Sequence, residues 1–492
     1  MKGKRRFCDC LRVGARYLRR MTLHIPFQNS YGTLPDRFFT RQNAEPVRAP
    51  DLLVFNDALA AELGISAGTP EDMAQVFGGN RMPDGADPLA QVYAGHQFGG
   101  FSPQLGDGRA LLLGEVVKGD GRRVDIQLKG SGRTPYSRNG DGRAWLGPVL
   151  REYLLSEAFH ALDVPTTRAL AAVATGERVQ RETGLPGALL TRVASSHIRV
   201  GTFQYFYAQR DLEGLQALYD YTRDRHYPEA ETPHDLLRAV IQRQVKLVVK
   251  WMGIGFIHGV MNTDNTTLSG ETIDFGPAAF MDKFHPVTVY SSIDRQGRYS
   301  YDNQINIICW NMAQLASCLV PLMPDGEVAV AGFTATVNMM PNQIRAEWLR
   351  VFGQKIGIAD ATPEDEPLIG DLLRLMAHHE ADFTNTFRAL SEGAEIKDAS
   401  DPAAFTDWRA RWQQRIADED APLDLMRRVN PAVIPRNHRM EQMIAAAVNG
   451  DMAPFDRLLR VLSEPYTLSP DDADLTAPPQ PEEVVQATFC GT

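Results

Sequence analysis

The chain has 492 residues, of which 43% are hydrophobic and 23% charged, and its formal net charge is −10. These values are typical of a globular protein with two to four domain-sized units, or with one core and added segments. The acidic balance argues against a general nucleic-acid-binding protein, which would present a basic surface. No apolar run approaches the ~18 residues of a membrane-spanning helix, so neither nucleic acid nor membrane is expected as a partner.

Residues 1–20 form a basic arm with eight Lys or Arg and one acidic residue. The arm lacks the apolar centre of a secretory signal. Because it is rich in Arg and nearly free of acidic residues, it has some features of a mitochondrial presequence, which is the minor alternative. The favoured interpretation is a start codon assigned too far upstream, with Met21 as the first residue of the protein.

Five cysteines are scattered along the chain without a repeated CxxC pattern. This sparse set predicts a reducing, cytoplasmic location and no structural zinc site. Cys309 and Cys318 lie in apolar surroundings and are expected to be buried. Cys490 follows a polar segment near the C-terminus, where its thiol is expected to be exposed.

Residues 21–90 predict an N-terminal extension, and residues 91–205 predict a strand-rich unit with one helix. Two strands at 110–117 and 124–130 should form a hairpin around the turn "KGDGR". The other elements expected in this unit are a helix at 151–162 and strands at 167–175 and 187–194.

Residues 206–330 predict a helical unit that carries the catalytic-type loops. A long amphipathic helix at 233–252 begins with Thr232 as its cap and Pro233 in its first turn. A second apolar helix is expected at 303–322, and residues 331–465 should be mostly helical. Residues 466–492 are too polar and Pro-rich to order themselves and predict a flexible tail.

Besides the hairpin turn at 119–122, the sequence GDGR occurs twice within the strand-rich unit, at 106–109 and 140–143, 34 residues apart. In the first copy, Gly106 and Gly108 would let backbone N–H groups approach phosphate oxygens, and Arg109 adds a positive charge. The second copy contains Asp141 and Gly142 and directly precedes the predicted helix. Each could be only a turn, but the repetition favours a ligand.

Charged residues follow the predicted strands. Lys129 ends an apolar strand and Glu152 lies in the next helix, an order that in kinases gives an ion pair. A solvated lysine and an exposed glutamate are the alternative. Arg192 and Arg199 follow a later hydrophobic strand and would be costly inside a cleft unless they met an anion.

The segment "HGVMNTDNTTLSGETIDFGP", residues 258–277, has the spacing of a kinase catalytic loop followed by Asp-Phe-Gly. Val260 stands where a kinase has its catalytic aspartate. Asn265 and Asp274 offer oxygen ligands suited to Mg²⁺. Asp264 is then the candidate general base within the loop.

Taken together, these residues resemble the selenoprotein-O family of protein adenylyltransferases, which have a protein-kinase-like fold. The segments that carry the resemblance include "PLAQVYAGHQFGGFSPQLGDGRALLLGE", "LKGSGRTPYSRNGDGRA", "GFIHGVMNTDN" and "DFGPAAFMD". It runs from about residue 88 to 312, continues through 429–437 and reaches the C-terminal cysteine.

The resemblance implies an α+β, protein-kinase-like two-lobed fold with an N-terminal extension and a mostly helical C-terminal extension. It implies transfer of AMP from ATP to Ser, Thr or Tyr hydroxyls of proteins, with ATP bound in an orientation flipped relative to kinases. Asp264 matches the proton acceptor, Glu152 the helix partner of the lysine, and Asn265 and Asp274 the ligands of Mg²⁺, with Mn²⁺ as an alternative metal. The matching nucleotide-binding positions are Gly106, Gly108, Arg109, Lys129, Asp141, Gly142, Arg192 and Arg199.

Cys490 occupies the place of the selenocysteine in some animal members of that family. In some bacterial members this cysteine can pair with one in the activation-type segment, but residues 284–300 here contain no cysteine. An intramolecular switch is therefore not expected. A mixed disulfide with glutathione or a redox protein and an unreactive tail thiol both stay open.

Two other functions stay open at this point. One is a kinase-like phosphotransferase that moves the γ-phosphate, and the other is a pseudokinase that binds nucleotide without catalysis. Retention of Lys129, Glu152, Asn265 and Asp274 together argues against the second, because a scaffold has little need of two metal ligands.

Overall fold

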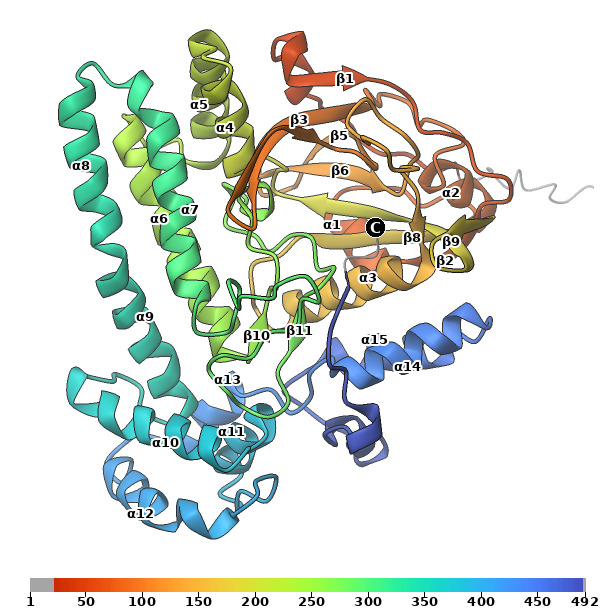
Figure 1. Cartoon of the computed structure of the whole chain (residues 1–492). Helices are drawn as coiled ribbons and strands as arrows, with labels where there is room; N and C mark the ends of the chain where they lie inside the picture. The colour runs from red at the N-terminus through yellow and green to blue at the C-terminus, as the bar shows by residue number, and fades with distance from the viewer. Residues whose placement is uncertain (1–21, 490–492) are drawn as a thin grey trace, which may run out of the picture.

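The computed structural model describes residues 22–489 and shows a mixed α and β architecture with an antiparallel sheet (Figure 1). The basic arm, Met21 and Cys490 lie outside the described residues. The strands are β1 (Phe39–Arg41), β2 (Asp51–Phe55), β3 (Leu89–Gln97), β4 (Gly100–Gly106), β5 (Ala110–Val117), β6 (Arg123–Lys129), β7 (Ala144–Trp145), β8 (Arg168–Gln180), β9 (Gly184–Ala194), β10 (Phe256–Ile257) and β11 (Ala279–Phe280). The helices are α1 (Asp57–Glu62), α2 (Pro70–Phe77), α3 (Leu146–Ala161), α4 (Val200–Ala208), α5 (Leu212–His226), α6 (Pro233–Gly253), α7 (Gln304–Leu319), α8 (Gly326–Asn338), α9 (Met340–Lys355), α10 (Glu366–His378), α11 (Phe383–Ser391), α12 (Thr406–Arg415), α13 (Pro422–Val429), α14 (Asn437–Val448) and α15 (Ala453–Leu462).

The main sheet has the strand order β1-β3-β5-β6-β9-β8-β2, with β4 paired to β3 and β7 to β9. The predicted hairpin is confirmed as β5 and β6, and the two later predicted strands as β8 and β9. The segment expected to be an N-terminal extension supplies both edge strands, β1 and β2. The described part of the predicted extension, residues 22–90, is therefore part of the main sheet and not a separate segment packed on it.

Helix α3 packs on β8 and β9, and its Glu152 bonds to Lys129 at the end of β6. It begins at Leu146, five residues before the predicted start at 151. Pro148 obscured this first turn in the sequence, but proline is tolerated there because the first N–H groups of a helix have no partner within the helix.

Helix α6 confirms the predicted 233–252 helix almost to the residue. The Thr232 hydroxyl and the Asp235 carboxylate each accept a hydrogen bond from the other's backbone N–H, a reciprocal cap at the N-terminus. Figure 1 shows α6 beside α7, with α8 and α9 alongside and α10–α13 beyond them. The C-terminal end of α6 leads directly into the catalytic-type loop.

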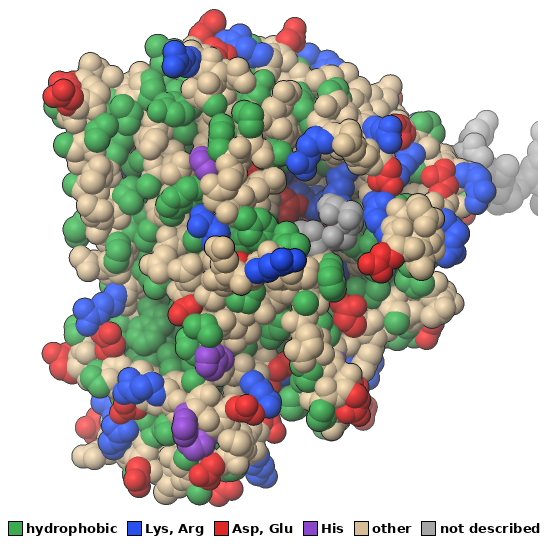
Figure 2. Space-filling model, in the orientation of Figure 1, with side chains coloured by type: hydrophobic (Ala, Val, Ile, Leu, Met, Phe, Trp, Pro, Cys, Tyr) green, Lys and Arg blue, Asp and Glu red, His purple; other side chains and the backbone are tan. Residues whose placement is uncertain are grey.

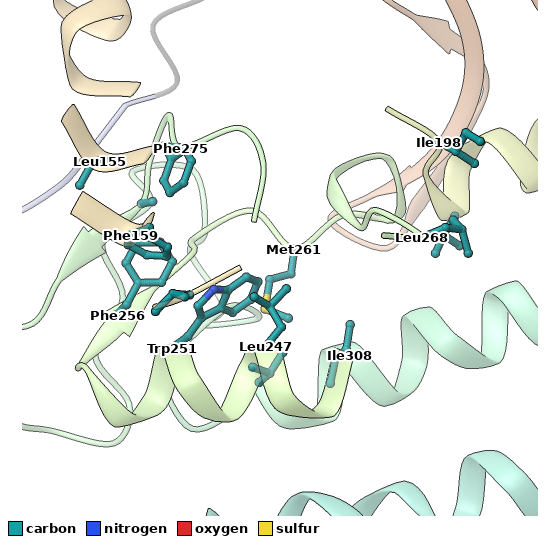
Figure 3. Packing of buried hydrophobic residues seen from close by; sticks show 14 of the residues in the cluster. Leu155, Phe159, Ile198, Leu247, Trp251, Phe256, Met261, Leu268, Phe275 and Ile308 are labelled. Carbon is teal, nitrogen blue, oxygen red and sulfur yellow. The ribbon is translucent and has the colours of Figure 1, made fainter. Parts of the chain in front are cut away.

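Aromatic side chains fix this junction (Figure 3). The ring of Phe275, from Asp-Phe-Gly, packs edge-on against Phe159 of α3 with centroids 5.2 Å apart. Phe159 also packs against Phe256 at 4.6 Å, and Trp251 of α6 lies 5.8 Å from Phe256. The loops that follow α6 are therefore anchored in the core shared by α3 and α6.

The expectation that no run is long enough to cross a membrane is wrong for Gln304–Leu322. By length and composition alone this stretch passes that test, with a mean hydropathy of 1.4. Its polar residues hid the run in the sequence, yet Gln304 and Asn311 are buried and bonded to backbone carbonyls of the loops. The helix packs against α4 and α6 and belongs to the core.

The tail expected to remain loose contacts the protein as far as Thr488, whereas Phe489 is exposed. Asp472 accepts hydrogen bonds from Arg457 and Arg460 of α15, and Leu475 is buried. Farther on, the Thr488 N–H donates to the Tyr290 carbonyl at 2.7 Å. The composition of the tail predicted disorder because composition contains no information about hydrogen-bond partners in other segments, such as α15.

The two cysteines within residues 22–489 are free thiols. Cys318 is buried as expected, whereas Cys309 is only partly buried. Burial raises the pKa of Cys309 to about 11 and also raises the pKa of Cys318, so neither residue provides a reactive thiolate near neutral pH.

Candidate functional site

Lys129, Glu152 and Arg192 meet where the sheet faces helix α3. The Lys129 Nζ donates to Glu152 Oε2 at 2.6 Å, which is the ion pair expected from the sequence. The Arg192 Nε donates to the other oxygen of the same carboxylate at 2.9 Å. Neighbouring strands β6 and β9 bring the two cations together, because Lys129 pairs with Leu190, two residues before Arg192.

Asp274 joins this cluster from the Asp-Phe-Gly loop. Its Oδ1 accepts hydrogen bonds from Lys129 at 2.7 Å and from Arg192 at 2.6 Å. The backbone of Asp274 has a φ of +61°, a conformation that costs a non-glycine residue about 1 kcal/mol or more. The buried Phe275 and the ion pairs hold the residue there.

Arg199 extends the cluster from the N-terminus of α4. Its guanidinium donates to the Asp264 carbonyl at 2.9 Å and lies 3.5 Å from Asp274 Oδ2. It also stacks on the ring of Tyr93, 4.4 Å from the centroid. Three cations thus converge on Asp274, so the arginines that would have been costly without an anion do meet one.

The charges set the protonation of the two carboxylates. Burial opposes ionisation of Asp274, but Arg192 and Lys129 outweigh it and hold its pKa well below the usual value. The same balance of burial against Arg192 and Lys129 lowers the pKa of Glu152. Burial and the charge of Arg192 lower the pKa of Lys129. Both carboxylates are therefore ionised at neutral pH.

The catalytic-type loop lies beside this cluster. His258 is buried and its Nε2 donates to the Ile273 carbonyl at 2.9 Å, which ties the loop to the segment before Asp274. Val260 is buried, and its carbonyl accepts from the Asn265 side-chain amide at 3.1 Å. A short 3₁₀ turn, Thr263–Asn265, presents Asp264 and Asn265.

Asp264 differs from the other carboxylates of the site. It is buried, it forms no salt bridge with any residue between 22 and 489, and Gln97 donates to its Oδ2 at 3.0 Å. Burial raises the pKa of Asp264 to about 6, against the effect of that hydrogen bond. A carboxylate with a pKa close to neutral suits proton abstraction.

Both GDGR turns lie at the same opening. Gly106 has a φ of +145°, and a Cβ at Gly108 would come within 2.9 Å of the Tyr136 carbonyl, so both of these positions in the first turn need glycine. Asp141 pairs with Arg181 at 2.8 Å, although its side chain is 42% exposed. Gly142 has a φ of +68° and its Cα lies tightly against Gly132.

These residues line one cavity of about 1030 Å³. Figure 2 shows this face hollowed beside the sheet, with Lys and Arg side chains around the opening. The predicted residues that line it are Gly106, Gly108, Arg109, Lys129, Asp141, Gly142, Glu152, Arg192, Arg199, Asp264, Asn265 and Asp274.

The family model for protein adenylyltransferase SelO matches residues 21–463. The chain belongs to the SelO family. It is also 61% identical to the protein nucleotidyltransferase YdiU of Ruegeria sp. (strain TM1040), over 96% of this chain and 100% of that protein. The YdiU proteins of Ruegeria pomeroyi and Geobacillus kaustophilus are 59% and 54% identical, over 96% and 95% of this chain and 100% and 99% of their own lengths.

Three polar residues of this SelO-family site were not predicted. Gln97 lies in the quoted segment "YAGHQFGG", but nothing local indicates that it bonds to Asp264, 167 positions later. Asp107, inside the first GDGR, is buried and accepts from the Gln91 N–H at 3.1 Å, which anchors that turn. Arg181 could have been suspected only by pairing it with Asp141.

The oxygen donors of this SelO-family chain fit a hard divalent cation. Asn265 donates its amide nitrogen to Val260, which leaves its Oδ1 on the opposite side of the amide group. Among residues 22–489, the donor to the other Asp274 oxygen, Oδ2, is Arg199 at the longer distance of 3.5 Å. No group of three His, Cys, Asp or Glu side chains suited to a metal occurs within residues 22–489, so a cation here would also need ligands from a substrate.

Proposed function

We propose that this chain transfers AMP from ATP to the hydroxyl of a Ser, Thr or Tyr side chain in a protein, with release of pyrophosphate. Its membership of a family described as protein adenylyltransferase supports this activity. The observation that carries it is the juxtaposition, in one cavity, of a cationic cluster and a buried carboxylate, Asp264, that forms no salt bridge within residues 22–489.

In this proposal the chain has a protein-kinase-like fold of two lobes with the cavity between them. The sheet and α3 correspond to the smaller lobe, and α4 to α7 correspond to the larger. The ion pair between Lys129 and Glu152, and the Asp-Phe-Gly loop that meets it, support this assignment.

The cations serve the phosphates. Lys129, Arg192 and Arg199 are held close together and offer donors to the β- and γ-phosphates of a flipped ATP, so that the α-phosphate lies toward the acceptor. Such fixed donors stabilise the negative charge that develops on the pyrophosphate leaving group. Arg109 and the glycines of both GDGR turns complete the binding of the nucleotide.

Asn265 and Asp274 would hold Mg²⁺, or Mn²⁺, together with phosphate oxygens. When bound, the metal supplies charge neutralisation at the reacting phosphate. Asp264 accepts the proton of the attacking hydroxyl. Its pKa of about 6 means that the carboxylate is mostly ionised at neutral pH and can take up this proton. Val260 stands at the position of the kinase aspartate, so the carboxylate that γ-phosphate transfer would use is missing from this position.

Parallel incubations with α-labelled and γ-labelled ATP test the proposal. Protein acceptors should gain label from α-labelled ATP only, and Asp264→Asn should abolish it. Asp224→Asn, which makes the same change at an exposed position on α5, serves as the control. Label gained only from γ-labelled ATP would establish the kinase-like alternative, and binding without any transfer would establish the non-catalytic one.

Two further predictions belong to this proposal. The protein works in the cytoplasm, where a free thiol at Cys490 can form a mixed disulfide with glutathione or a redox protein. Mass analysis of the protein after treatment with oxidised glutathione tests this, and an unmodified Cys490 would favour the unreactive thiol.

A further inference from the structure

The β3–β4 hairpin reaches across the cavity to the catalytic-type loop. Its strands pair up to Gln97 and Gly100, and the two residues between them, Phe98 and Gly99, have φ values of 51° and 87°. Two consecutive positive φ angles are typical of the tight turn that matches the twist of a hairpin. The tip is therefore short and has little freedom to change shape.

Backbone hydrogen bonds fix the tip to the loop. The His96 N–H donates to the Thr263 hydroxyl at 2.7 Å, and the Phe98 N–H donates to Asn262 Oδ1 at 3.1 Å. These two contacts lie on either side of Gln97. Its side chain is therefore directed at the residue that follows Thr263 in the loop, which is Asp264.

Each partner of the tip is itself held in place. The Thr263 hydroxyl donates to Gln204 Oε1 at 2.6 Å, and the Tyr299 hydroxyl donates to Asn262 Oδ1 at 2.6 Å. The hairpin thus joins a network that includes α4 and the segment before α7, and small movements of Gln97 are resisted from several sides.

The two carboxylate oxygens of Asp264 have different surroundings. Oδ2 accepts the hydrogen bond from Gln97 Nε2, whereas Oδ1 is buried and has no hydrogen-bond partner in the described part of the chain. Oδ1 lies against Gly95, where a Cβ would come within 2.5 Å of it. Arg199 bonds to the backbone carbonyl of Asp264 and not to its carboxylate.

We propose that Gln97 is a positioning residue for Asp264: it holds the carboxylate so that Oδ1 stays against Gly95 and Oδ2 is the oxygen that accepts the proton of the acceptor hydroxyl. This inference rests on the proposed function. A carboxylate oxygen has two lone pairs, so Oδ2 can accept from Gln97 and still receive a proton. Without the donor, the carboxylate is free to rotate, and productive orientation becomes a small fraction of its states.

Gln97→Met tests the role of the donor, because methionine keeps the length and packing but cannot donate. We expect kcat for AMP transfer to fall roughly tenfold or more, as for loss of a hydrogen bond to a charged group. The KM for ATP and the melting temperature should stay unchanged, since Gln97 contacts Asp264 and not the cationic cluster. A residue that only stabilised the hairpin would instead lower the melting temperature or raise KM.

Gly95→Ala tests the second half of the proposal. The added methyl group must displace Oδ1, so kcat should fall while ATP binding persists. Gly100→Ala, in the same hairpin, is the matched control because its Cβ would meet only ordinary contacts at 3.5 Å, and it should retain wild-type kcat.

A double-mutant cycle separates positioning from other effects. If Gln97 acts through Asp264, Gln97→Met should lower kcat much less in an Asp264→Asn background than in the wild type. If the wild-type protein transfers AMP and Gln97→Met has the same kcat, the positioning role alone is overturned. If the wild-type protein transfers only the γ-phosphate, the proposed function is overturned. The ratio of kcat between the wild type and Gln97→Met would then still test the positioning of Asp264. No transfer by the wild type would overturn both.

Discussion

Replacing Asp274 with Asn removes the anion on which three cations converge. The Lys129 and Arg192 hydrogen bonds to Oδ1 are 2.7 and 2.6 Å long, and Arg199 lies 3.5 Å from Oδ2. Breaking a buried pair costs about 3–5 kcal/mol. Because Glu152 still pairs with Lys129 and Arg192, and because the Asp274 side chain is 23% exposed, we expect a loss near the lower figure, about 3 kcal/mol.

The same change should have opposite effects on ATP binding and on transfer. The repulsion between the Asp274 carboxylate and one phosphate charge of ATP, roughly 6 Å apart at an effective dielectric constant near 20, is about 3 kcal/mol. This energy corresponds to on the order of 100-fold in affinity for ATP. Metal-free ATP should therefore bind more tightly to Asp274→Asn than to the wild type. AMP transfer in the presence of Mg²⁺ should fall by roughly 100-fold or more, because a ligand of the metal is lost.

Calorimetric titration with ATP in EDTA measures the first effect, and α-label transfer in Mg²⁺ measures the second. Thermal unfolding without nucleotide measures the loss of stability. Asp224→Asn should leave all three unchanged. Two results would refute the charge argument: weaker binding of metal-free ATP to Asp274→Asn than to the wild type, or AMP transfer by Asp274→Asn at the wild-type rate.

Two further variants probe other parts of the molecule. Burial lowers the pKa of Lys355 from 10.5 to about 7. Between those pH values the unfolded chain binds more protons than the folded one, so Lys355 makes stability rise with pH by up to about 1.4 kcal/mol per unit above pH 7 and adds no slope below it. Denaturant unfolding from pH 6 to 9 should show that this part of the slope is missing in Lys355→Met; equal slopes would contradict the prediction. Gly142→Ala introduces a Cβ at a φ of +68° that overlaps Gly132, and should weaken ATP binding roughly tenfold or more. Gly119→Ala is the control, because its Cβ meets no atom of residues 22–489 within 4 Å, and it should leave ATP binding unchanged. Equal Kd values for the two variants would show that the Gly142 turn tolerates a side chain.

Local patterns predicted the elements whose causes are local. The cap at Thr232 and the apolar face of the following helix sufficed for α6, and two strand-like segments around a Gly-containing turn sufficed for β5 and β6. The order of Lys129 and Glu152 predicted their ion pair because kinases place the paired lysine and glutamate in the same order, on a strand and on the following helix.

Contacts between distant segments could not be predicted in this way. Asp274 is 145 positions from Lys129, and Gln97 is 167 positions from Asp264. No periodicity in either segment specifies the partner, because such pairs depend on how the hairpin and the loops fold over the cavity. The ordering of the tail by Asp472 has the same origin, since its partners belong to α15.

The central claim is that the α-phosphate of ATP, and not the γ-phosphate, reaches an acceptor hydroxyl. Peptide mass spectrometry of the protein and its acceptors after incubation with Mg²⁺ and ATP tests this most directly. The account predicts AMP on Ser, Thr or Tyr side chains, absent with Asp264→Asn. Phosphate on those side chains in place of AMP would contradict it.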